Sequence, residues 1–189
     1  MQLVFATHNK NKFIEVKALL PSYINLLSLE DIHCTKDIPE TGQTIEENAI
    51  LKANFIQENY NLNCFADDTG LEVEALGGAP GVHSARYAGA NKNSEANIQK
   101  LLQELKEDIN RKARFKTVIA LNLGNEKIMF QGIVNGQIAH EKKGNGGFGY
   151  DPVFIPEGHD QTFAELPLTA KNKISHRAQA MHQLIDYLK

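Results

Sequence analysis

The amino-acid sequence predicts an α/β protein in which helices flank a mixed β-sheet. Apolar residues recur at helical spacing in the first half of the chain and again at its end. Two long β-rich runs lie in mid-chain, and strands do not alternate strictly with helices, which disfavours a doubly wound sheet of parallel strands. A length of 189 residues suits one domain that spans 1–189, or two closely packed lobes.

The N-terminal segment predicts a strand, a polar loop and a helix in that order. Residues 2–6 are mostly apolar and of β type, and the polar residues 7–11 follow them. A helix comes next and ends at Pro21, because proline cannot continue it. Its apolar residues at helical spacing are Phe13, Val16 and Leu20.

A capping box predicts the start of a second helix. Thr44 is followed three residues later by Glu47, a pattern that satisfies the first N–H groups of a helix. We expect this helix to continue to about Asn59. One face carries the apolar residues Ile45, Ala49, Ala53 and Ile56.

Two acidic residues separate a pair of short predicted strands. Residues 64–66 form a brief buried strand that ends at Asp67 and Asp68, and residues 71–73 alternate like a second strand. The glycines and the proline of 77–81 then predict a loop, since they sustain neither regular element.

The second half of the chain predicts a helix, a hairpin and a final helix. Ser94 caps the first of these helices, and the β-rich runs 115–123 and 127–134 are separated by a turn, which is typical of a hairpin. A third strand over 137–140 would extend the hairpin into an antiparallel meander. A short strand at 153–155 precedes a C-terminal helix with the apolar residues Ile174, Ala178, Met181, Ile185 and Leu188.

The composition is that of an ordinary globular protein with a slight excess of acid. Hydrophobic residues make up 42% and charged residues 23%, and 20 Lys and Arg against 23 Asp and Glu give a net charge of −3. This balance excludes intrinsic disorder. It also disfavours binding to nucleic acid or to anionic membranes, which needs an excess of basic residues over a whole face. A polyanionic ligand would need a local basic cluster.

Two cysteines, Cys34 and Cys64, indicate neither a disulfide framework nor a structural zinc site. They form no CxxC pair, and no His stands at zinc-finger spacing, so we expect two reduced, buried thiols. No stretch approaches the roughly 18 apolar residues of a membrane span. The N-terminal apolar run is too short for a signal-peptide core, and we expect a cytoplasmic protein.

The loop Thr7–Lys12 is the first segment that could carry chemistry. It lies between a predicted strand and a helix, where free backbone N–H groups and the positive end of the helix dipole favour an anion. Its lysine and hydroxyl side chains add donors, which suits phosphate. The glycines and the Gly-Lys-Ser/Thr ending of a Walker loop are absent. A solvated polar helix start is the alternative.

Acidic residues form the second candidate. Asp67 and Asp68, together with the acidic turn at Glu40, offer oxygen ligands that suit Mg²⁺ with several retained waters. Adjacent side chains of a strand point to opposite faces, so we expect only one of the two aspartates to enter a site fully. A turn in which the aspartates cap backbone N–H groups is the alternative.

Basic and aromatic residues in the last quarter form the third candidate. Lys171, Lys173, His176 and Arg177 make a basic cluster that could face phosphates or could be a solvated helix face. The segment 148–151, Phe-Gly-Tyr-Asp, could stack a nucleobase and bond its edge or its sugar. A glycine-rich turn with aromatic core residues is the alternative there.

Six segments, in this order and at this spacing, resemble the inosine triphosphate pyrophosphatase family. The resemblance covers nearly the whole chain, and the order of the six segments makes it specific. The segments are Thr7–Lys12, Glu40–Gly42, Asp67–Leu71, Leu76–Gly81 with Ser84–Gly89, Gly147–Pro152, and Ser175–Arg177.

This resemblance implies Mg²⁺-dependent hydrolysis of non-canonical purine nucleoside triphosphates, such as ITP, dITP and XTP. The products are the monophosphate and pyrophosphate, and the reaction removes deaminated purines from the nucleotide pool. The resemblance also implies a homodimer of elongated mixed α/β subunits, each with two lobes and an active-site cleft between them. A small nucleotide is then the partner, rather than a nucleic acid or a membrane.

By position, the resemblance assigns Asp68 as general base and metal-associated carboxylate, and Glu40 as a second metal-associated acid. His176 and Arg177 would grip the purine edge, since their donors suit the 6-oxo group of hypoxanthine and xanthine better than the amino group of adenine. The substrate-binding positions are Thr7, His8, Asn9, Lys10, Asn11, Lys12, Thr69, Phe148, Gly149, Tyr150, Asp151, Lys171, His176 and Arg177.

Two other functions remain open at this point. A pyrophosphatase of the related Maf type would act on pyrimidine or modified nucleotides, and a panel of triphosphates separates it from the first hypothesis. A catalytically silent nucleotide-binding or RNA-contacting protein would bind without releasing pyrophosphate.

Overall fold

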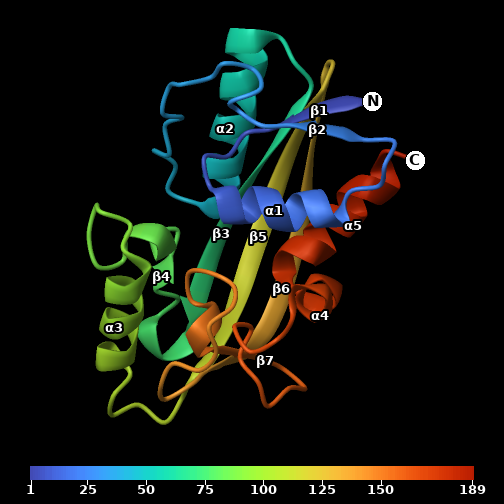
Figure 1. Ribbon diagram of the computed structural model, residues 1–189. Helices are drawn as coiled ribbons and strands as arrows, with labels where there is room; N and C mark the ends of the chain where they lie inside the picture. The colour runs from blue at the N-terminus through green and yellow to red at the C-terminus, as the bar shows by residue number, and fades with distance from the viewer. The chain divides into compact units, whose positions relative to one another are not determined.

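The computed structural model describes residues 1–189 and contains a mixed seven-stranded sheet. The strand order is β2-β1-β3-β5-β6-β7, and β4 pairs with β3 outside this path (Figure 1). β2 and β3 run parallel to β1, whereas β4 runs antiparallel to β3 and β7 antiparallel to β6, which confirms the predicted mixed sheet. The strands are β1 Gln2–Phe5, β2 Asn25–Leu27, β3 Cys64–Val73, β4 Pro80–Gly81, β5 Lys112–Leu123, β6 Glu126–Ile138 and β7 Phe154–Pro156.

Five α-helices accompany the strands, and the first two agree with the prediction. Side chains cap the start of both. Asn9 accepts hydrogen bonds from the first turn of α1, and Thr44 Oγ1 accepts the N–H of Glu47 in α2 at 3.1 Å. Short 3₁₀ turns occur at 74–76, 84–86 and 151–153. The helices are α1 Lys10–Leu19, α2 Ile45–Tyr60, α3 Ser94–Glu104, α4 Leu168–Ile174 and α5 His176–Tyr187.

The chain divides into two compact units, each assembled from segments that are far apart in the sequence. The first unit consists of Met1–Asp68, Thr117–Gly132 and Arg177–Lys189, and the second of Thr69–Lys116 and Ile133–His176. The strands β3, β5 and β6 contribute residues to both units. Each unit has its own hydrophobic core.

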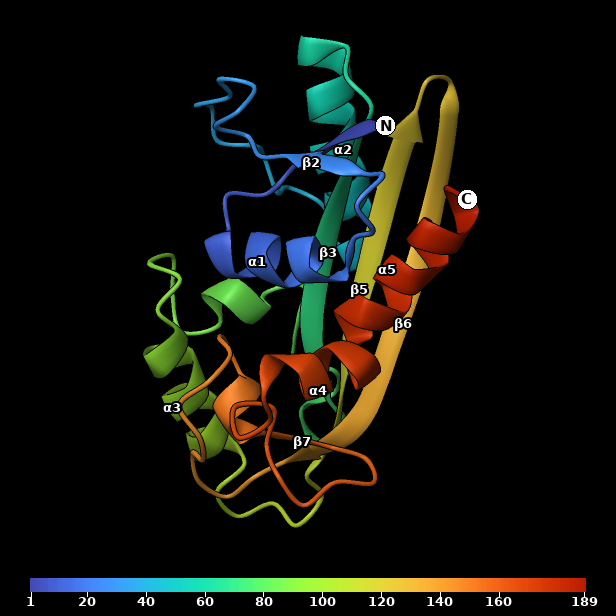
Figure 2. The same cartoon turned by 45° about the vertical axis from the view of Figure 1, so that its right-hand side comes forward.

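In the first unit, helices cover both faces of the strands. Helices α1 and α5 lie on one face, and α2 lies on the other (Figures 1 and 2). Neighbouring residues of β1 divide between the faces: Phe5 packs with Val16 of α1 and Met181 of α5, whereas Val4 packs with Ala53 of α2. The same alternation decides which side chains of β3 face which helix.

Aromatic packing forms the core of the second unit. The rings of Phe115 and Phe154 have centroids 4.7 Å apart and planes at 59°, a favourable tilted arrangement. Phe163 joins them, and Leu101 of α3 belongs to the same buried cluster. These contacts hold β7 and the segment before α4 against β5.

The two acidic residues lie inside one continuous strand, so the predicted break at Asp67 and Asp68 is wrong. Both carboxylates are ion-paired with lysines, which offsets the cost of placing them in a buried strand. Pro80–Gly81, predicted as part of a loop, forms the short strand β4. Proline is tolerated there because β4 pairs only with β3 and lies off the main path of the sheet.

Three further boundaries differ from the prediction. Asn93, not Ser94, caps α3, and its side chain accepts a hydrogen bond from the first turn. β6 continues without a break to Ile138, so the predicted third strand over 137–140 is wrong. The C-terminal periodicity belongs to two helices, because Ser175 is extended, with φ −67° and ψ 154°, between α4 and α5.

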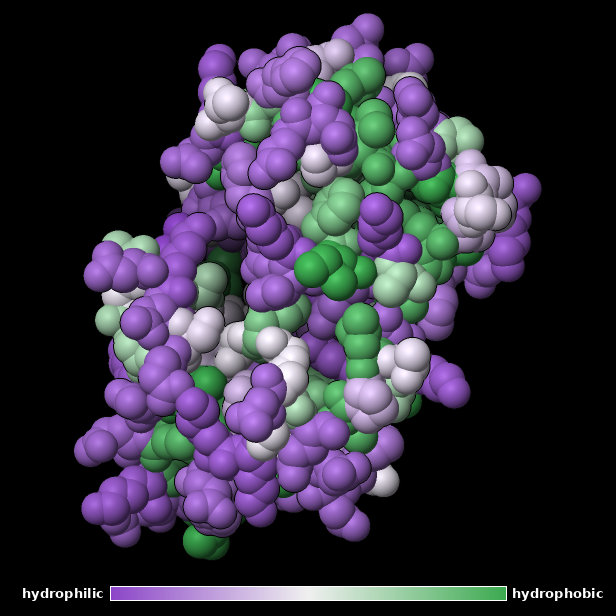
Figure 3. All heavy atoms as spheres, viewed as in Figure 1, coloured by the Kyte–Doolittle hydropathy of each residue, from purple (hydrophilic) through white to green (hydrophobic).

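The surface and the cysteines agree with the composition. Figure 3 shows one face, on which hydrophilic side chains predominate and apolar ones gather near α1. Ile14 and Tyr23 are among the exposed apolar side chains of the first unit. Both cysteines are buried free thiols, as predicted. None of the helices combines the length and the apolar character needed to cross a membrane.

Candidate functional site

Two carboxylates and one ammonium form a largely buried group in the first unit. Lys52 of α2 donates to Asp68 Oδ1 at 2.9 Å and to Glu40 Oε1 at 3.0 Å. The side chain of Lys52 is 8% exposed, that of Asp68 13% and that of Glu40 25%. One lysine therefore joins α2, the segment before it, and β3.

A second group of charged side chains lies in the same unit. Lys12 Nζ donates to Asp67 Oδ1 at 3.0 Å, and Arg177 Nε donates to Oδ2 of the same carboxylate, also at 3.0 Å. Arg177 Nη1 donates in addition to Glu15 Oε2 at 2.5 Å. The side chains of Arg177 and Asp67 are 2% and 1% exposed. Ion pairs thus join α1, β3 and α5.

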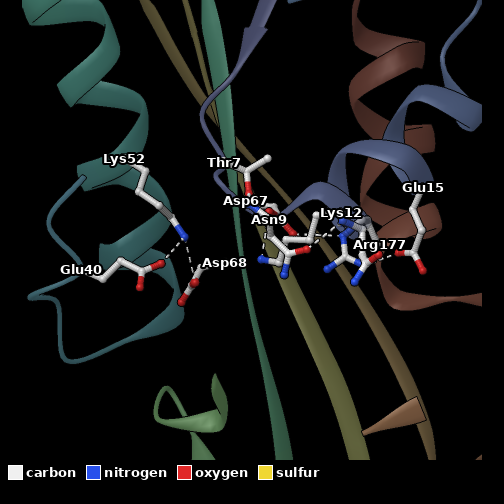
Figure 4. A network of polar contacts seen from close by, with 10 residues as sticks. Thr7, Asn9, Lys12, Glu15, Glu40, Lys52, Asp67, Asp68 and Arg177 are labelled. Carbon is white, nitrogen blue, oxygen red and sulfur yellow. Dashed lines mark hydrogen bonds and ion pairs between the residues drawn. The ribbon is translucent and has the colours of Figure 1, made fainter. Parts of the chain in front are cut away.

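The two groups lie on opposite faces of β3. Figure 4 shows Asp68 turned toward Lys52, and Asp67 turned toward Lys12 and Arg177. Asp67 belongs to the face covered by α1 and α5, and Asp68 to the face covered by α2. The prediction that neighbouring aspartates point to different faces is confirmed.

Neighbouring charges decide how these groups titrate. Burial alone would lower the pKa of Lys52, but the carboxylates of Asp68 and Glu40 outweigh burial and raise it. Burial alone would raise the pKa of Asp67, but Lys12 and Arg177 hold that pKa well below its usual range. For Lys12, burial prevails and lowers the pKa. Lys12 is therefore the more acidic of the two ammonium groups.

Two side chains of the predicted phosphate loop bond to the loop's own backbone. Asn9 Oδ1 accepts the N–H groups of Asn11 and Lys12 at 3.0 and 3.2 Å, and Thr7 Oγ1 accepts the N–H of Asn9 at 3.1 Å. The expectation that these N–H groups are free for an anion is therefore wrong, because Asn9 caps the helix with them. The exposed residues of the loop are His8, Asn9, Lys10 and Asn11.

The glycine-rich segment of the second unit is organised around Asp151. Its Oδ2 accepts the N–H of Phe148 at 2.7 Å and the ammonium of Lys171 at 2.5 Å. The same ammonium lies 5.1 Å from the centroid of the Phe148 ring. Gly147 has φ +68°, and a Cβ there would lie 2.1 Å from Asp151 Oδ2, so only glycine fits. Phe148, Asp151 and Lys171, all predicted to bind substrate, therefore lie together.

His176 and Tyr150 are buried in the second unit. The His176 ring stacks on Phe115, with centroids 4.5 Å apart and planes at 18°. The Tyr150 hydroxyl donates to the carbonyl oxygen of Ser84 at 2.9 Å. Thr69 is half-buried, in the part of β3 that belongs to this unit. Tyr150 thus connects the predicted base-binding segment to the 3₁₀ turn at 84–86.

The basic residues of the last quarter do not form one helix face. Lys171 and Lys173 lie in α4, the first buried and the second exposed, whereas His176 and Arg177 begin α5. Arg177 belongs to the first unit, where it pairs with carboxylates. The expectation that these residues share one helix face is therefore wrong, because the chain turns at Ser175.

Comparison with known proteins identifies the family. A model of the Ham1 family matches residues 3–187. The chain belongs to the Ham1 family. A relative from Christiangramia forsetii, named dITP/XTP pyrophosphatase, is 60% identical over 188 residues, which cover 100% of this chain and 99% of the relative. A relative of the same name from Bacillus subtilis is 48% identical and is covered to 96%, against 99% of this chain.

Solved Ham1 structures have the same fold. The Ham1 protein of Staphylococcus aureus has a TM-score of 0.90 at 42% identity, and the match covers 100% of this chain and 98% of that one. A HAM1 protein from Coxiella burnetii has a TM-score of 0.91 at 41% identity, with the same coverage. The fold class and the family resemblance predicted from the motifs are confirmed.

Lys52 and Glu15 of this Ham1 chain were not predicted as site residues. Lys52 lies at helical spacing from Ala49 and Ile56, on the buried face of α2. A lysine at such a position signals a buried acidic partner, since lysine is almost never buried unless paired. Glu15 carries no comparable signal, because Lys12 three residues earlier offers it an ordinary surface pair.

A groove in the second unit of this Ham1 chain contains none of the predicted site residues. Its volume is about 690 Å³, and residues of β3, β5, β6 and β7 line it. Arg114 and Glu72 form an ion pair at 2.6 Å on its wall. Neither charged group of the first unit contributes to this groove.

Proposed function

We propose that this Ham1 chain is a nucleoside triphosphate pyrophosphatase that hydrolyses ITP, dITP and XTP to the monophosphate and pyrophosphate. The observation that carries the proposal is the 60% identity, over the whole chain, to a protein named dITP/XTP pyrophosphatase. The relative from Bacillus subtilis bears the same name. Such an enzyme removes deaminated purines from the nucleotide pool.

Mg²⁺ is the proposed cofactor, held by Asp68 and Glu40. The donor set suits this ion, which prefers carboxylate oxygens and completes its shell with waters and substrate phosphates. Asp68 Oδ1 and Glu40 Oε1 already face one cation, the ammonium of Lys52. When bound, the ion offsets the charge of the triphosphate and polarises its phosphoryl oxygens.

Asp68 is the proposed general base. Its carboxylate orients a water molecule and accepts the proton of that water during attack at the α-phosphorus. Before substrate binds, Lys52 donates to Oδ1 at 2.9 Å and holds the carboxylate in one orientation. With a side chain 13% exposed, Asp68 is accessible to water.

Lys12 and Lys171 are the proposed phosphate ligands. Each ammonium is held by a carboxylate, Lys12 by Asp67 at 3.0 Å and Lys171 by Asp151 at 2.5 Å. A donor that is oriented before the substrate arrives stabilises developing charge without reorganisation. The two lysines would thus stabilise the leaving pyrophosphate.

His176, Arg177, Phe148 and Asp151 are the residues proposed to select the purine. The donors of His176 and Arg177 favour a 6-oxo acceptor over the amino group of adenine, because facing donors would leave polar atoms unpaired. Phe148 offers a ring for stacking, and Lys171 holds Asp151 in place. The remaining proposed contacts are Thr7, His8, Asn9, Lys10, Asn11, Thr69, Gly149 and Tyr150.

A nucleotide panel tests this function. The purified protein is incubated with Mg²⁺ and ITP, dITP, XTP, ATP, GTP, CTP or UTP, and both products are identified. We expect IMP and pyrophosphate from ITP, and much slower release from ATP. Orthophosphate and IDP would mean attack at the γ-phosphorus and would rule out the mechanism.

The same panel separates the two alternatives. A preference for pyrimidine or modified nucleotides would indicate Maf-type activity. Nucleotide binding without release of pyrophosphate would indicate a silent binding protein. The group of Asp68, Glu40 and Lys52 argues against the silent protein, since binding alone does not require a base.

A homodimer in the cytoplasm is the proposed working state. The family resemblance drawn from the motifs supports the dimer, and a substrate from the nucleotide pool supports the compartment. Light scattering coupled to size exclusion measures the mass directly. A monomer mass at micromolar concentration would contradict the proposed dimer.

A further inference from the structure

Lys52 occupies the position between Glu40 and Asp68 that a metal ion would take. Its Nζ lies 2.9 Å from Asp68 Oδ1 and 3.0 Å from Glu40 Oε1. The lysine side chain is only 8% exposed, so little water screens these contacts. A second cation entering between the same oxygens must displace the ammonium, because like charges repel strongly at such distances.

The charges of the three groups explain why the ammonium competes with a metal. Two carboxylates (−2) and one ammonium (+1) leave −1, whereas the carboxylates alone would match a divalent ion. The ammonium is tethered to α2 and is always present at high effective concentration. Mg²⁺ comes from solution and gives up its hydration water reluctantly. The resident cation therefore has the advantage when no other anion is near.

We propose that Lys52 is a resident counter-ion that keeps a divalent metal out of the Glu40–Asp68 pair until a polyphosphate is present. A triphosphate supplies an anion for the displaced ammonium, so the metal and the nucleotide enter together. This role rests on the proposed function of Glu40 and Asp68 as metal ligands. It couples metal binding to substrate binding through one side chain.

Replacement of Lys52 tests the coupling without a catalytic readout. In Lys52→Met the two carboxylates lose their counter-ion, so Mg²⁺ should bind at least about tenfold more tightly in the absence of nucleotide. Calorimetry measures this affinity, and electron paramagnetic resonance measures the same change for Mn²⁺. Lys52→Gln keeps a donor but no charge and should change in the same direction. Lys52→Arg keeps the charge and should bind as weakly as the wild type.

Lys12→Met is the matched control. It also removes a partly buried ammonium of the first unit, but one that pairs with Asp67. Its affinity for Mg²⁺ should change much less than that of Lys52→Met. A double variant, Lys52→Met with Asp68→Asn, should lose the gain, which would locate the ion at Asp68.

A measurement on the unaltered protein does not depend on the folding of any variant. In protein labelled with ¹⁵N and ¹³C at lysine, the side-chain resonances of Lys52 should stay in place with Mg²⁺ alone and move when inorganic triphosphate is added together with Mg²⁺. Lys52→Arg assigns these resonances by their disappearance. Resonances that move with Mg²⁺ alone, or that stay in place when Mg²⁺ and triphosphate are both present, would overturn the counter-ion role.

The outcomes separate this role from the proposed activity. Tighter metal binding by Lys52→Met or Lys52→Gln, lost with Asp68→Asn, supports the counter-ion role even if no nucleotide is hydrolysed. Unchanged or weaker binding by the folded variants overturns the role even if ITP is hydrolysed by the wild type. If neither variant folds, the lysine resonances of the wild type decide.

Discussion

Single residues show why neighbouring aspartates are assigned different roles. Lys12 and Arg177 each donate to Asp67 at 3.0 Å, and the side chain of Asp67 is 1% exposed. Asp68 accepts from Lys52 at 2.9 Å, and its side chain is 13% exposed. A general base must reach water, whereas a carboxylate that only holds a lysine in place need not. Asp68 therefore suits proton transfer, and Asp67 suits the positioning of Lys12.

Asp68→Asn should abolish turnover while leaving the fold intact. The amide keeps the size of the side chain but cannot accept the proton of the attacking water, so kcat should fall by about 10²- to 10⁴-fold. Pyrophosphate release from ITP measures kcat, and circular dichroism checks the fold. Asp160→Asn, at an exposed position, is the matched control. Activity near that of the wild type would show that the base lies elsewhere.

Arg177→Ala should narrow the preference for ITP over ATP and also destabilise the protein. The guanidinium is buried between Asp67 and Glu15, so its removal leaves two buried carboxylates without this partner and costs about 3 to 5 kcal/mol. The ratio of kcat/KM for the two nucleotides, measured where the variant is folded, reports selectivity. Arg114→Ala, at a half-exposed pair, should change neither quantity much. An unchanged ratio would move base recognition to other residues.

Among the elements, those with local signals in the sequence were predicted well. Those that depend on contacts between distant segments were not. Helix α1 was predicted from the spacing of its apolar residues, and α2 from the capping box at Thr44, and both signals are local. The unbroken strand β3 was not, because Asp67 and Asp68 look like turn residues until lysines from α1 and α2 are placed beside them. The break at Ser175 was missed since apolar spacing continues across it.

Gly136→Ala should destabilise the pairing of β6 with β7. A Cβ at this position would lie 2.2 Å from the carbonyl oxygen of Ile155 and 3.0 Å from Cα of Pro156, so the strands must move apart. We expect a loss of about 1 to 3 kcal/mol in the free energy of unfolding, measured with denaturant. Asn135→Ala, at the exposed neighbouring position, is the control. Equal stability of the two variants would contradict the close approach.

For the whole molecule, the net charge of −3 does not show how the basic side chains are arranged. Lys12, Lys52, Lys171 and Arg177 are each paired with carboxylates inside the protein, so they form no broad basic face. This arrangement disfavours a long nucleic acid and is compatible with one small polyanion. The composition predicted that nucleic acid is disfavoured. The carboxylate partners of these basic side chains could be identified only from the fold.

Stability should fall in acid partly through Asp67. The pKa of this carboxyl is depressed in the folded protein and returns to about 3.8 on unfolding, so its contribution is full above that value and is lost as pH falls through the folded pKa. The free energy of unfolding should decrease from about pH 5 downward. Asp67→Asn should be less stable at neutral pH and show a smaller decrease. Parallel curves for both proteins would contradict the depressed pKa.

The motifs predicted more of the candidate site than the residue patterns alone. Glu40 and Asp68 were both expected at a metal site, and the fold brings them to one ammonium. Lys52, which joins them, was not predicted as a site residue because it lies in no motif. Only its position on the buried face of α2 indicates a role. Arg177 was expected to face a purine, and its pairing with Glu15 was visible only in three dimensions.

Hydrolysis of ITP in water enriched in ¹⁸O tests the central claim most directly. Attack at the α-phosphorus places the label in IMP and leaves pyrophosphate unlabelled, as mass spectrometry of both products would show. We predict one ¹⁸O atom in IMP for each turnover in the presence of Mg²⁺. Label in pyrophosphate, or in orthophosphate released with IDP, would contradict the proposed pyrophosphatase mechanism.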